Sequence, residues 1–140
     1  MKRIVIIATI LTMNFLSYGQ IFTHIMKQDK FEDTIWEKEI KTFVTIGETF
    51  ITLETKGQTP LTYIIEGVTH RGSEEEPIIL SNSSNVWGYE YHLQTRGKNS
   101  SKPYTIVITF ILEEYPYNFR TYSYLSVEDP KDNTRTIYYY

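Results

Sequence analysis

The feature that most constrains this chain is a run of side chains with a period of two over residues 104–112. The even positions are all apolar: Tyr104, Ile106, Ile108, Phe110 and Leu112. The odd positions mix Thr with Val and Ile. Because successive side chains of a β-strand point to opposite faces, this pattern predicts a central strand with one fully buried face.

A second strand-like run follows directly after a short interruption. Pro116 closes the segment 113–116, and because proline cannot donate to a strand ladder, we expect the chain to turn there. Residues 117–127 then resume the alternation, with Tyr117, Phe119, Leu125 and Val127 on one parity. The two runs therefore predict a hairpin around which the rest of the chain is arranged.

The remaining chain reads as further strands joined by short polar turns. We expect strands at residues 21–26, 34–41, 42–55 as a hairpin, 61–66, 77–80, 86–94 and 136–140. Residues 67–77, which contain Gly72 and three consecutive glutamates, are expected to form a solvated loop. The pattern predicts an all-β fold, an antiparallel meander that forms either a small barrel or a two-sheet sandwich. The short turns favour the barrel.

The register of the hairpin at residues 42–55 can be predicted from its turn. If Gly47 and Glu48 form a two-residue loop, Val44 pairs with Ile51 and Thr42 pairs with Leu53. Four apolar side chains then share one face: Val44, Ile46, Ile51 and Leu53. Phe43 and Phe50 fall on the second face, where we expect them to be partly covered.

The first 19 residues have the layout of a secretory signal peptide. Lys2 and Arg3 precede an apolar run over residues 4–16, and small residues stand before Gln20. An uncleaved anchor is the alternative, but such a run rises only ~20 Å as a helix, short of a hydrocarbon core of ~30 Å. We therefore expect residues 20–140 to form one exported domain, periplasmic or extracellular, with no stable membrane span after cleavage.

Composition limits the classes of partner and chemistry. The chain has no cysteine, which excludes disulfides, thiolate metal sites and a cysteine nucleophile, and which favours a bacterial envelope or secreted protein. Its formal net charge is −3 and becomes about −5 once Lys2 and Arg3 are set aside. A mildly acidic surface argues against nucleic acid as a partner.

Patterns of catalytic or metal-binding residues are weak. The three histidines, His24, His70 and His92, lack metal-ligand spacing, and no cofactor motif is present. Glu90 and His92 share one face of a strand and are the one candidate acid-base couple, although such a pair is more often part of a solvated face. We expect no metal, no cofactor and no enzymatic activity.

Aromatic residues are the one set that suggests a binding function. We take six of them as candidate ligand-binding residues: Trp36, Trp87, Tyr89, Tyr91, Tyr122 and Tyr124. Strand packing alone also enriches aromatic residues, so the same set fits a core. An aromatic surface would suit a small apolar ligand, a glycan or a protein partner.

The position of Trp36 near the start of the meander is similar to that of the tryptophan in lipocalin-like barrels. In those proteins the tryptophan closes one end and aromatic and aliphatic side chains line an interior cavity. Where those proteins have a Gly-x-Trp motif, this chain has Thr34-Ile35-Trp36, which lacks the glycine, so the two are similar only in the position of the tryptophan. It implies an exported domain that binds an apolar or sugar-like molecule, and the alternative is a structural or interaction protein of the cell envelope.

Overall fold

The protein was analysed as a computed structural model, which describes residues 20–81, 86–112 and 121–140. The predicted signal peptide and the predicted turn at residues 113–116 lie outside these residues, as do Tyr117 and Phe119. The described part of the chain forms nine strands and no helix. They are β1 (Gln20–Gln28), β2 (Thr34–Ile46), β3 (Phe50–Thr55), β4 (Leu61–Arg71), β5 (Ile78–Ser81), β6 (Val86–Gly97), β7 (Pro103–Leu112), β8 (Thr121–Asp129) and β9 (Thr134–Tyr139).

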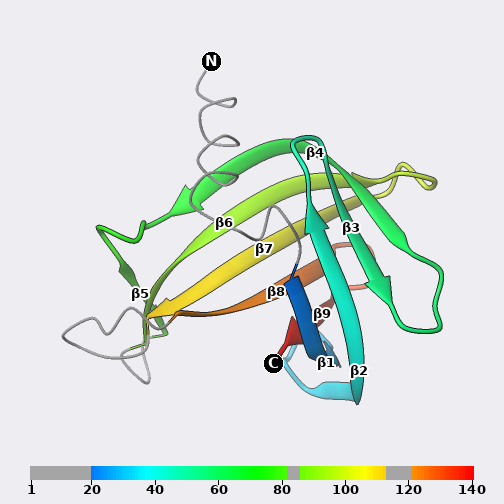
Figure 1. The fold of residues 1–140 in the computed structure, drawn as a ribbon, viewed down its shortest axis with the longest axis horizontal. Helices are drawn as coiled ribbons and strands as arrows, with labels where there is room; N and C mark the ends of the chain where they lie inside the picture. The colour runs from blue at the N-terminus through cyan, green and yellow to red at the C-terminus, as the bar shows by residue number, and fades with distance from the viewer. Residues whose placement is uncertain (1–19, 82–85, 113–120) are drawn as a thin grey trace.

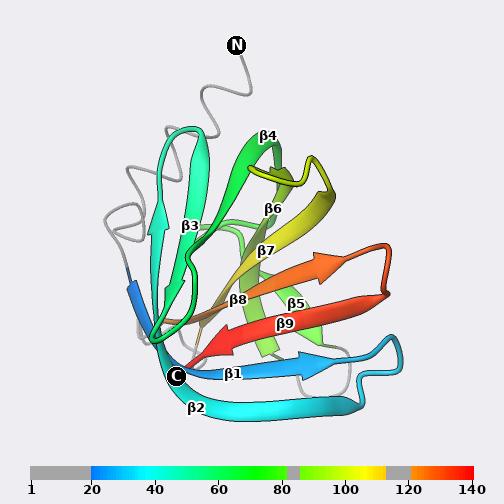
Figure 2. The same cartoon turned by 90° about the vertical axis from the view of Figure 1, so that its right-hand side faces the viewer.

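The nine strands form a single antiparallel sheet, which confirms the predicted all-β meander. Their order is β4-β3-β2-β1-β9-β8-β7-β6-β5, and an additional pairing between β4 and β6 turns the hydrogen-bonded sheet into a ring with β5 at its side. Figure 2 shows the curled sheet, in which the turn between β1 and β2 lies at the same end as the turn between β8 and β9. The arrangement is barrel-like, and it is one sheet rather than a two-sheet sandwich.

The hydrophobic core lies on the inner face of this curled sheet. Alternation selects its members in each strand, so that Ile106, Ile108 and Phe110 of β7 pack against Leu125 and Val127 of β8. Its other members are Phe22, Ile25, Val44, Ile46, Ile51, Leu53, Tyr63, Val68, Tyr89, Tyr91, Leu93 and Tyr138. The ribbon in Figure 1 shows β2 and β3 on one side of this core and β6, β7 and β8 on the other.

The predicted register of the second hairpin is wrong by two residues. Ile46 pairs with Ile51 and Val44 with Leu53, and the Gly47 N–H donates to the Phe50 carbonyl at 2.7 Å, so the turn is centred one residue later than predicted, on Glu48 and Thr49. A shift of two preserves parity, and for that reason the predicted inner face is still correct. Phe43 and Phe50 remain 40% and 48% exposed, so the expected cover over them is not found.

The predicted loop after residue 66 is also wrong, because β4 continues to Arg71. A bulge between Ile65 and Gly67 inserts one residue into the ladder with β6. The inner face therefore moves from the odd positions, such as Tyr63, to the even position Val68, which packs opposite Leu93. A search for one unbroken alternation misses a strand that contains such a bulge.

Candidate functional site

Two of the predicted binding residues belong to the packed core. Tyr89 and Tyr91 are each only 4% exposed. The ring of Tyr89 stacks on Phe110 with centroids 4.7 Å apart, and Tyr91 meets Phe110 edge-on at 6.0 Å. Burial raises the pKa of both phenols above the usual value, as expected for rings packed in an apolar interior. The structure assigns these tyrosines to the interior.

The two tryptophans lie on separate parts of the sheet. Trp36 of β2 stands opposite Lys27 of β1, whereas Trp87 of β6 stands opposite Ile79 and Leu112. Trp36 is 37% exposed, and the Lys38 ammonium lies 5.3 Å from its ring centroid. It therefore does not close one end of the fold as the lipocalin-like pattern implied.

The last two predicted residues follow each other on β8. The backbone of Tyr122 pairs with Ile111, and its side chain lies outside the described residues. Tyr124 faces outward, is half-buried and lines a groove on the outer face of the sheet. Of the candidate residues whose side chains the structure describes, Tyr124 is the one that lines this groove.

The groove crosses β1, β9 and β8, and we call it the outer groove. It has a volume of about 340 Å³ and is lined by Met26, Gln28, Glu32, Tyr124, Arg135, Ile137 and Tyr139. Register explains its outward position. Ile25, Tyr138 and Leu125 pair across the sheet and point into the core, so their neighbours Met26 and Ile137 point to the opposite face.

Arg135 provides the polar end of the outer groove. Its Nη2 donates to the Gln28 Oε1 at 3.0 Å and lies 3.5 Å from the Glu32 Oε1. These contacts hold three planar polar groups around one end of an apolar floor. A guanidinium, a carboxylate and an amide together supply both donors and acceptors to a ligand.

Tyr139 lies at the other end of the outer groove. Its hydroxyl donates to the Glu37 carboxylate, and this hydrogen bond together with burial raises the pKa of Tyr139 to about 12. The ring of His24 stacks on that of Tyr139, with centroids 5.1 Å apart. The Tyr139 ring is therefore fixed in orientation beside the groove floor.

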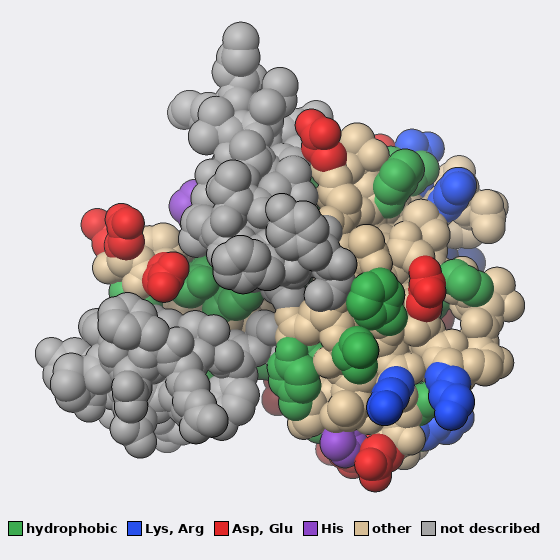
Figure 3. Space-filling model, in the orientation of Figure 1, with side chains coloured by type: hydrophobic (Ala, Val, Ile, Leu, Met, Phe, Trp, Pro, Cys, Tyr) green, Lys and Arg blue, Asp and Glu red, His purple; other side chains and the backbone are tan. Residues whose placement is uncertain are grey.

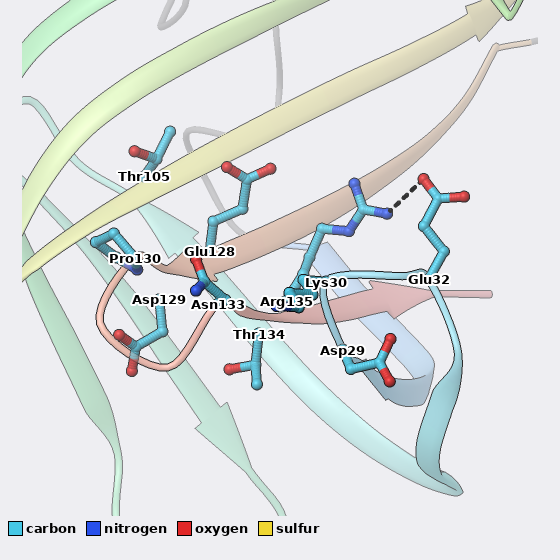
Figure 4. A pocket seen from close by; sticks show the side chains of 10 residues that line it. All are labelled: Asp29, Lys30, Glu32, Thr105, Glu128, Asp129, Pro130, Asn133, Thr134 and Arg135. Atoms are coloured by element: carbon cyan, nitrogen blue, oxygen red, sulfur yellow. Dashed lines mark ion pairs between the residues drawn. The ribbon is translucent and has the colours of Figure 1, made fainter.

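A second hollow of about 380 Å³ adjoins the first and shares Glu32 and Arg135 with it. It lies between the turn that joins β1 to β2 and the turn that joins β8 to β9. Figure 4 shows the ion pair between Glu32 and Arg135 at its edge. Its other lining residues are Asp29, Lys30, Thr105, Glu128, Asp129, Pro130, Asn133 and Thr134. Together the two hollows form one continuous polar and aromatic surface.

The predicted acid-base couple is formed, but outside this surface. His92 Nε2 and Arg71 Nη1 each lie 3.1 Å from Glu90 Oε1, on the outer face of β4 and β6. Thr109 stands between Glu90 and Tyr124 in the ladder, which separates the couple from the outer groove. No cluster of three or more His, Asp or Glu side chains suited to a metal ion occurs within the described ranges.

Most residues of the outer groove were not predicted from the sequence. Its walls come from both ends of the domain, since Met26 of β1 pairs with Ile137 of β9. Each strand shows the alternation that would place these side chains outward, but nothing local indicates that β1 and β9 are neighbours. The pairing that closes the ring had to be known first.

Comparisons with known proteins add no assignment to this geometry. No family model, curated protein or solved structure matches the chain. The described residues also contain no helix that is long and apolar enough to cross a membrane. The functional argument therefore depends on the groove itself.

Proposed function

We propose that the protein is an exported, non-catalytic domain that binds a sugar-like ligand in the outer groove. The observation that carries this proposal is the combination of aromatic rings and planar polar groups on one accessible surface. Tyr124 and Tyr139 stand over the floor, and Gln28, Glu32 and Arg135 surround one end. The signal peptide expected from the sequence supports a location in the periplasm or outside the cell.

A glycan fits this surface better than a purely apolar molecule. A pyranose ring presents an apolar face of C–H groups that packs on an aromatic ring, while its hydroxyl groups need several donors and acceptors at the edges. Small-ligand sites commonly measure about 300–1,000 Å³ and contain a few polar groups that fix orientation. The outer groove, at about 340 Å³, combines these properties.

The charge around the groove favours a neutral sugar. The positive charge of Arg135 is balanced by Glu32. In the adjoining hollow the carboxylates of Asp29, Glu128 and Asp129 outnumber the ammonium of Lys30 and that of Lys102, which pairs with Asp129. An acidic sugar would meet these carboxylates at close range, and like charges in partly buried positions repel. We therefore expect neutral hexoses or N-acetylated hexosamines to bind, and uronic acids to bind more weakly.

A screen of the purified protein against an array of neutral and acidic glycans tests the proposal, followed by calorimetry on the best ligand. Tyr124→Ala removes a ring from the groove floor and is expected to weaken binding at least about tenfold, since a lost stacking contact of about 1.4 kcal/mol has that effect. Phe50→Ala removes an exposed ring elsewhere and should leave affinity unchanged. No glycan bound by the parent protein, or equal losses in the two variants, would overturn the proposal.

Glu90 allows the non-catalytic part of the proposal to be tested separately. Glu90→Gln removes the carboxylate shared by His92 and Arg71 while keeping its shape. Each glycan that binds should be incubated with the parent protein and analysed for cleavage. We expect no products; turnover by the parent that Glu90→Gln abolishes would establish a hydrolase instead.

An interaction protein of the cell envelope is the second candidate, and one observation favours it. Ile21 and Phe43 pair across β1 and β2 on the outer face, and both are exposed. On this face, shown in Figure 3, hydrophobic side chains lie among charged ones. Light scattering after size exclusion distinguishes an interaction protein from a glycan-binding domain. A stable oligomer in the parent protein, and a monomer in Phe43→Ser, would support the interaction protein.

A further inference from the structure

The turn between β1 and β2 and the first residues of β2 carry three exposed apolar side chains. Phe31 is 72% exposed, Ile35 is 53% exposed, and Trp36 follows directly along β2. Exposed aromatic and aliphatic groups so close together are a departure from an ordinary protein surface. We call this region, residues 27–38, the β1–β2 tip.

The apolar groups of the β1–β2 tip do not share one face. Ile35 and Trp36 are consecutive residues of one strand, so their side chains leave opposite faces of the hairpin, and Phe31 lies in the turn itself. A flat protein surface could cover only one of these faces. A lipid headgroup layer surrounds whatever enters it, and so covers both. We infer that the β1–β2 tip inserts into the surface of a lipid bilayer.

Lysine side chains stand next to the aromatic rings of the tip. The Lys30 ammonium lies 5.1 Å from the centroid of Phe31, and that of Lys38 lies 5.3 Å from the centroid of Trp36. A lysine beside an inserted ring can keep its ammonium among the phosphates while its methylene groups contact the acyl region. Tryptophan itself is enriched at this depth of a bilayer.

Three of the four acidic side chains of the tip have partners within the protein. Asp29 Oδ1 accepts hydrogen bonds from the N–H groups of Phe31 and Asp33, at 2.8 and 3.0 Å. Glu32 pairs with Arg135, and the Glu37 carboxylate accepts the Tyr139 hydroxyl. Three lysines and four carboxylates leave the tip close to neutral. Insertion therefore depends on apolar burial, and a zwitterionic membrane is sufficient.

The backbone of β2 limits the depth of insertion. Within the described residues β2 pairs with β3 only from Thr42 to Ile46, so the outer edge of the stretch before Lys41 has no ladder partner there. Backbone N–H and C=O groups without partners are not tolerated in the hydrocarbon core. The tip is therefore held in the hydrated headgroup and upper acyl layer, within about 5–10 Å of the surface.

Fluorescence of a single tryptophan provides the direct test. The chain has two tryptophans, and Trp87→Phe leaves Trp36 as the only one. This variant is mixed with phosphatidylcholine vesicles, with and without brominated acyl chains. We expect the Trp36 emission to shift to shorter wavelength and to be quenched by the brominated lipid. Unchanged emission with all vesicles would overturn the inference.

Vesicle cosedimentation with paired variants identifies the residues responsible. The double variant Phe31→Ser with Ile35→Ser should lower the partition coefficient onto vesicles at least about tenfold. Each side chain buried in the bilayer contributes more than about 1.4 kcal/mol to the free energy of binding. Phe50→Ser with Leu61→Ser removes two exposed apolar side chains elsewhere, each 48% exposed, and this variant should bind like the parent protein. Circular dichroism confirms that both variants fold. Equal loss in both pairs, or no sedimentation of the parent protein with vesicles, would contradict insertion through the tip.

Discussion

The hydroxyl groups of Thr42 and Thr55 lie 2.9 Å apart in the interior, where the end of β3 pairs with the middle of β2. Both residues are buried, and Thr42 is fully so. A hydroxyl group buried in an apolar interior needs a hydrogen-bond partner, and here each hydroxyl provides that partner for the other. The pair therefore behaves as a unit.

Removing both of these hydroxyl groups should cost less than the sum of the costs of removing each one alone. Thr42→Val keeps the shape of the side chain but leaves the Thr55 hydroxyl buried without this partner, which should lower the free energy of unfolding by about 1–3 kcal/mol. Thr42→Val with Thr55→Val should cost clearly less than the sum of the two single variants. Urea denaturation of all four proteins measures the coupling, and strictly additive losses would show that the two hydroxyls contribute independently.

Adjacent residues of β3 test the alternation on which the fold depends. Ile51 is fully buried on the inner face and Phe50 is 48% exposed on the outer face. Ile51→Ala should lower the free energy of unfolding by about 2–5 kcal/mol because it leaves a cavity. Phe50→Ala should change it by about 0.5 kcal/mol or less, as surface substitutions do. Denaturant midpoints compare the two, and a larger loss at Phe50 would mean that the faces of β3 are assigned wrongly.

Alternation predicted which face of a strand is buried more reliably than which residues pair. Val44 and Ile51 were placed correctly on the inner face although their partners were wrong by two residues, because an even shift moves no side chain to the other face. The bulge at Ile65 shows the opposite case, since a single inserted residue reversed the pattern and concealed the end of β4.

The candidate site was less predictable than the fold for a related reason. Composition identified aromatic residues but could not separate Tyr89, which packs in the core, from Tyr124, which lines the outer groove. Both belong to well-formed alternating strands. Tyr124 points outward because its neighbour Leu125 points into the core, and the pairing of β1 with β9, which joins strands from opposite ends of the domain, sets which outward side chains lie beside it.

Buried tyrosines should make the protein sensitive to alkaline pH. Burial raises the pKa of Tyr138 to about 12, and burial also raises the pKa of Tyr63 and Tyr89. The unfolded chain loses these protons near pH 10, whereas the folded chain keeps them to higher pH. Above pH 10 the folded state therefore binds more protons than the unfolded state, and stability falls as pH rises. The loss is expected between about pH 10 and pH 12.

Tyr138→Phe measures the part of this effect that comes from one residue. Because the pKa of Tyr138 rises from the usual 10.0 to about 12, ionisation of this residue should lower the free energy of unfolding by about 2–3 kcal/mol. The free energy of unfolding, measured by denaturant at intervals from pH 8 to pH 12, should fall less steeply in Tyr138→Phe than in the parent protein. Identical slopes for the two proteins would show that the Tyr138 hydroxyl does not resist ionisation.

Gly88 is the glycine where an added methyl group should be most harmful. It is buried in β6 between β5 and β7, and a Cβ there would overlap the Phe110 carbonyl oxygen and lie 2.8 Å from Leu80 Cδ1. Because Phe110 contributes backbone at this contact, the ladder between β6 and β7 must shift to make room. Gly88→Ala should therefore lower the free energy of unfolding by about 3 kcal/mol or more.

Gly47→Ala is the matched control for this substitution. A Cβ at Gly47 would approach the Phe50 carbonyl oxygen to 3.4 Å, an ordinary contact, and its φ lies outside the left-handed region. The change should alter stability by less than about 1 kcal/mol, and it could increase it by restricting the unfolded chain. Thermal melts of both variants under the same conditions test the pair. If Gly88→Ala melted within a few degrees of the parent protein, β6 and β7 could not approach each other as closely at this position as the structure shows.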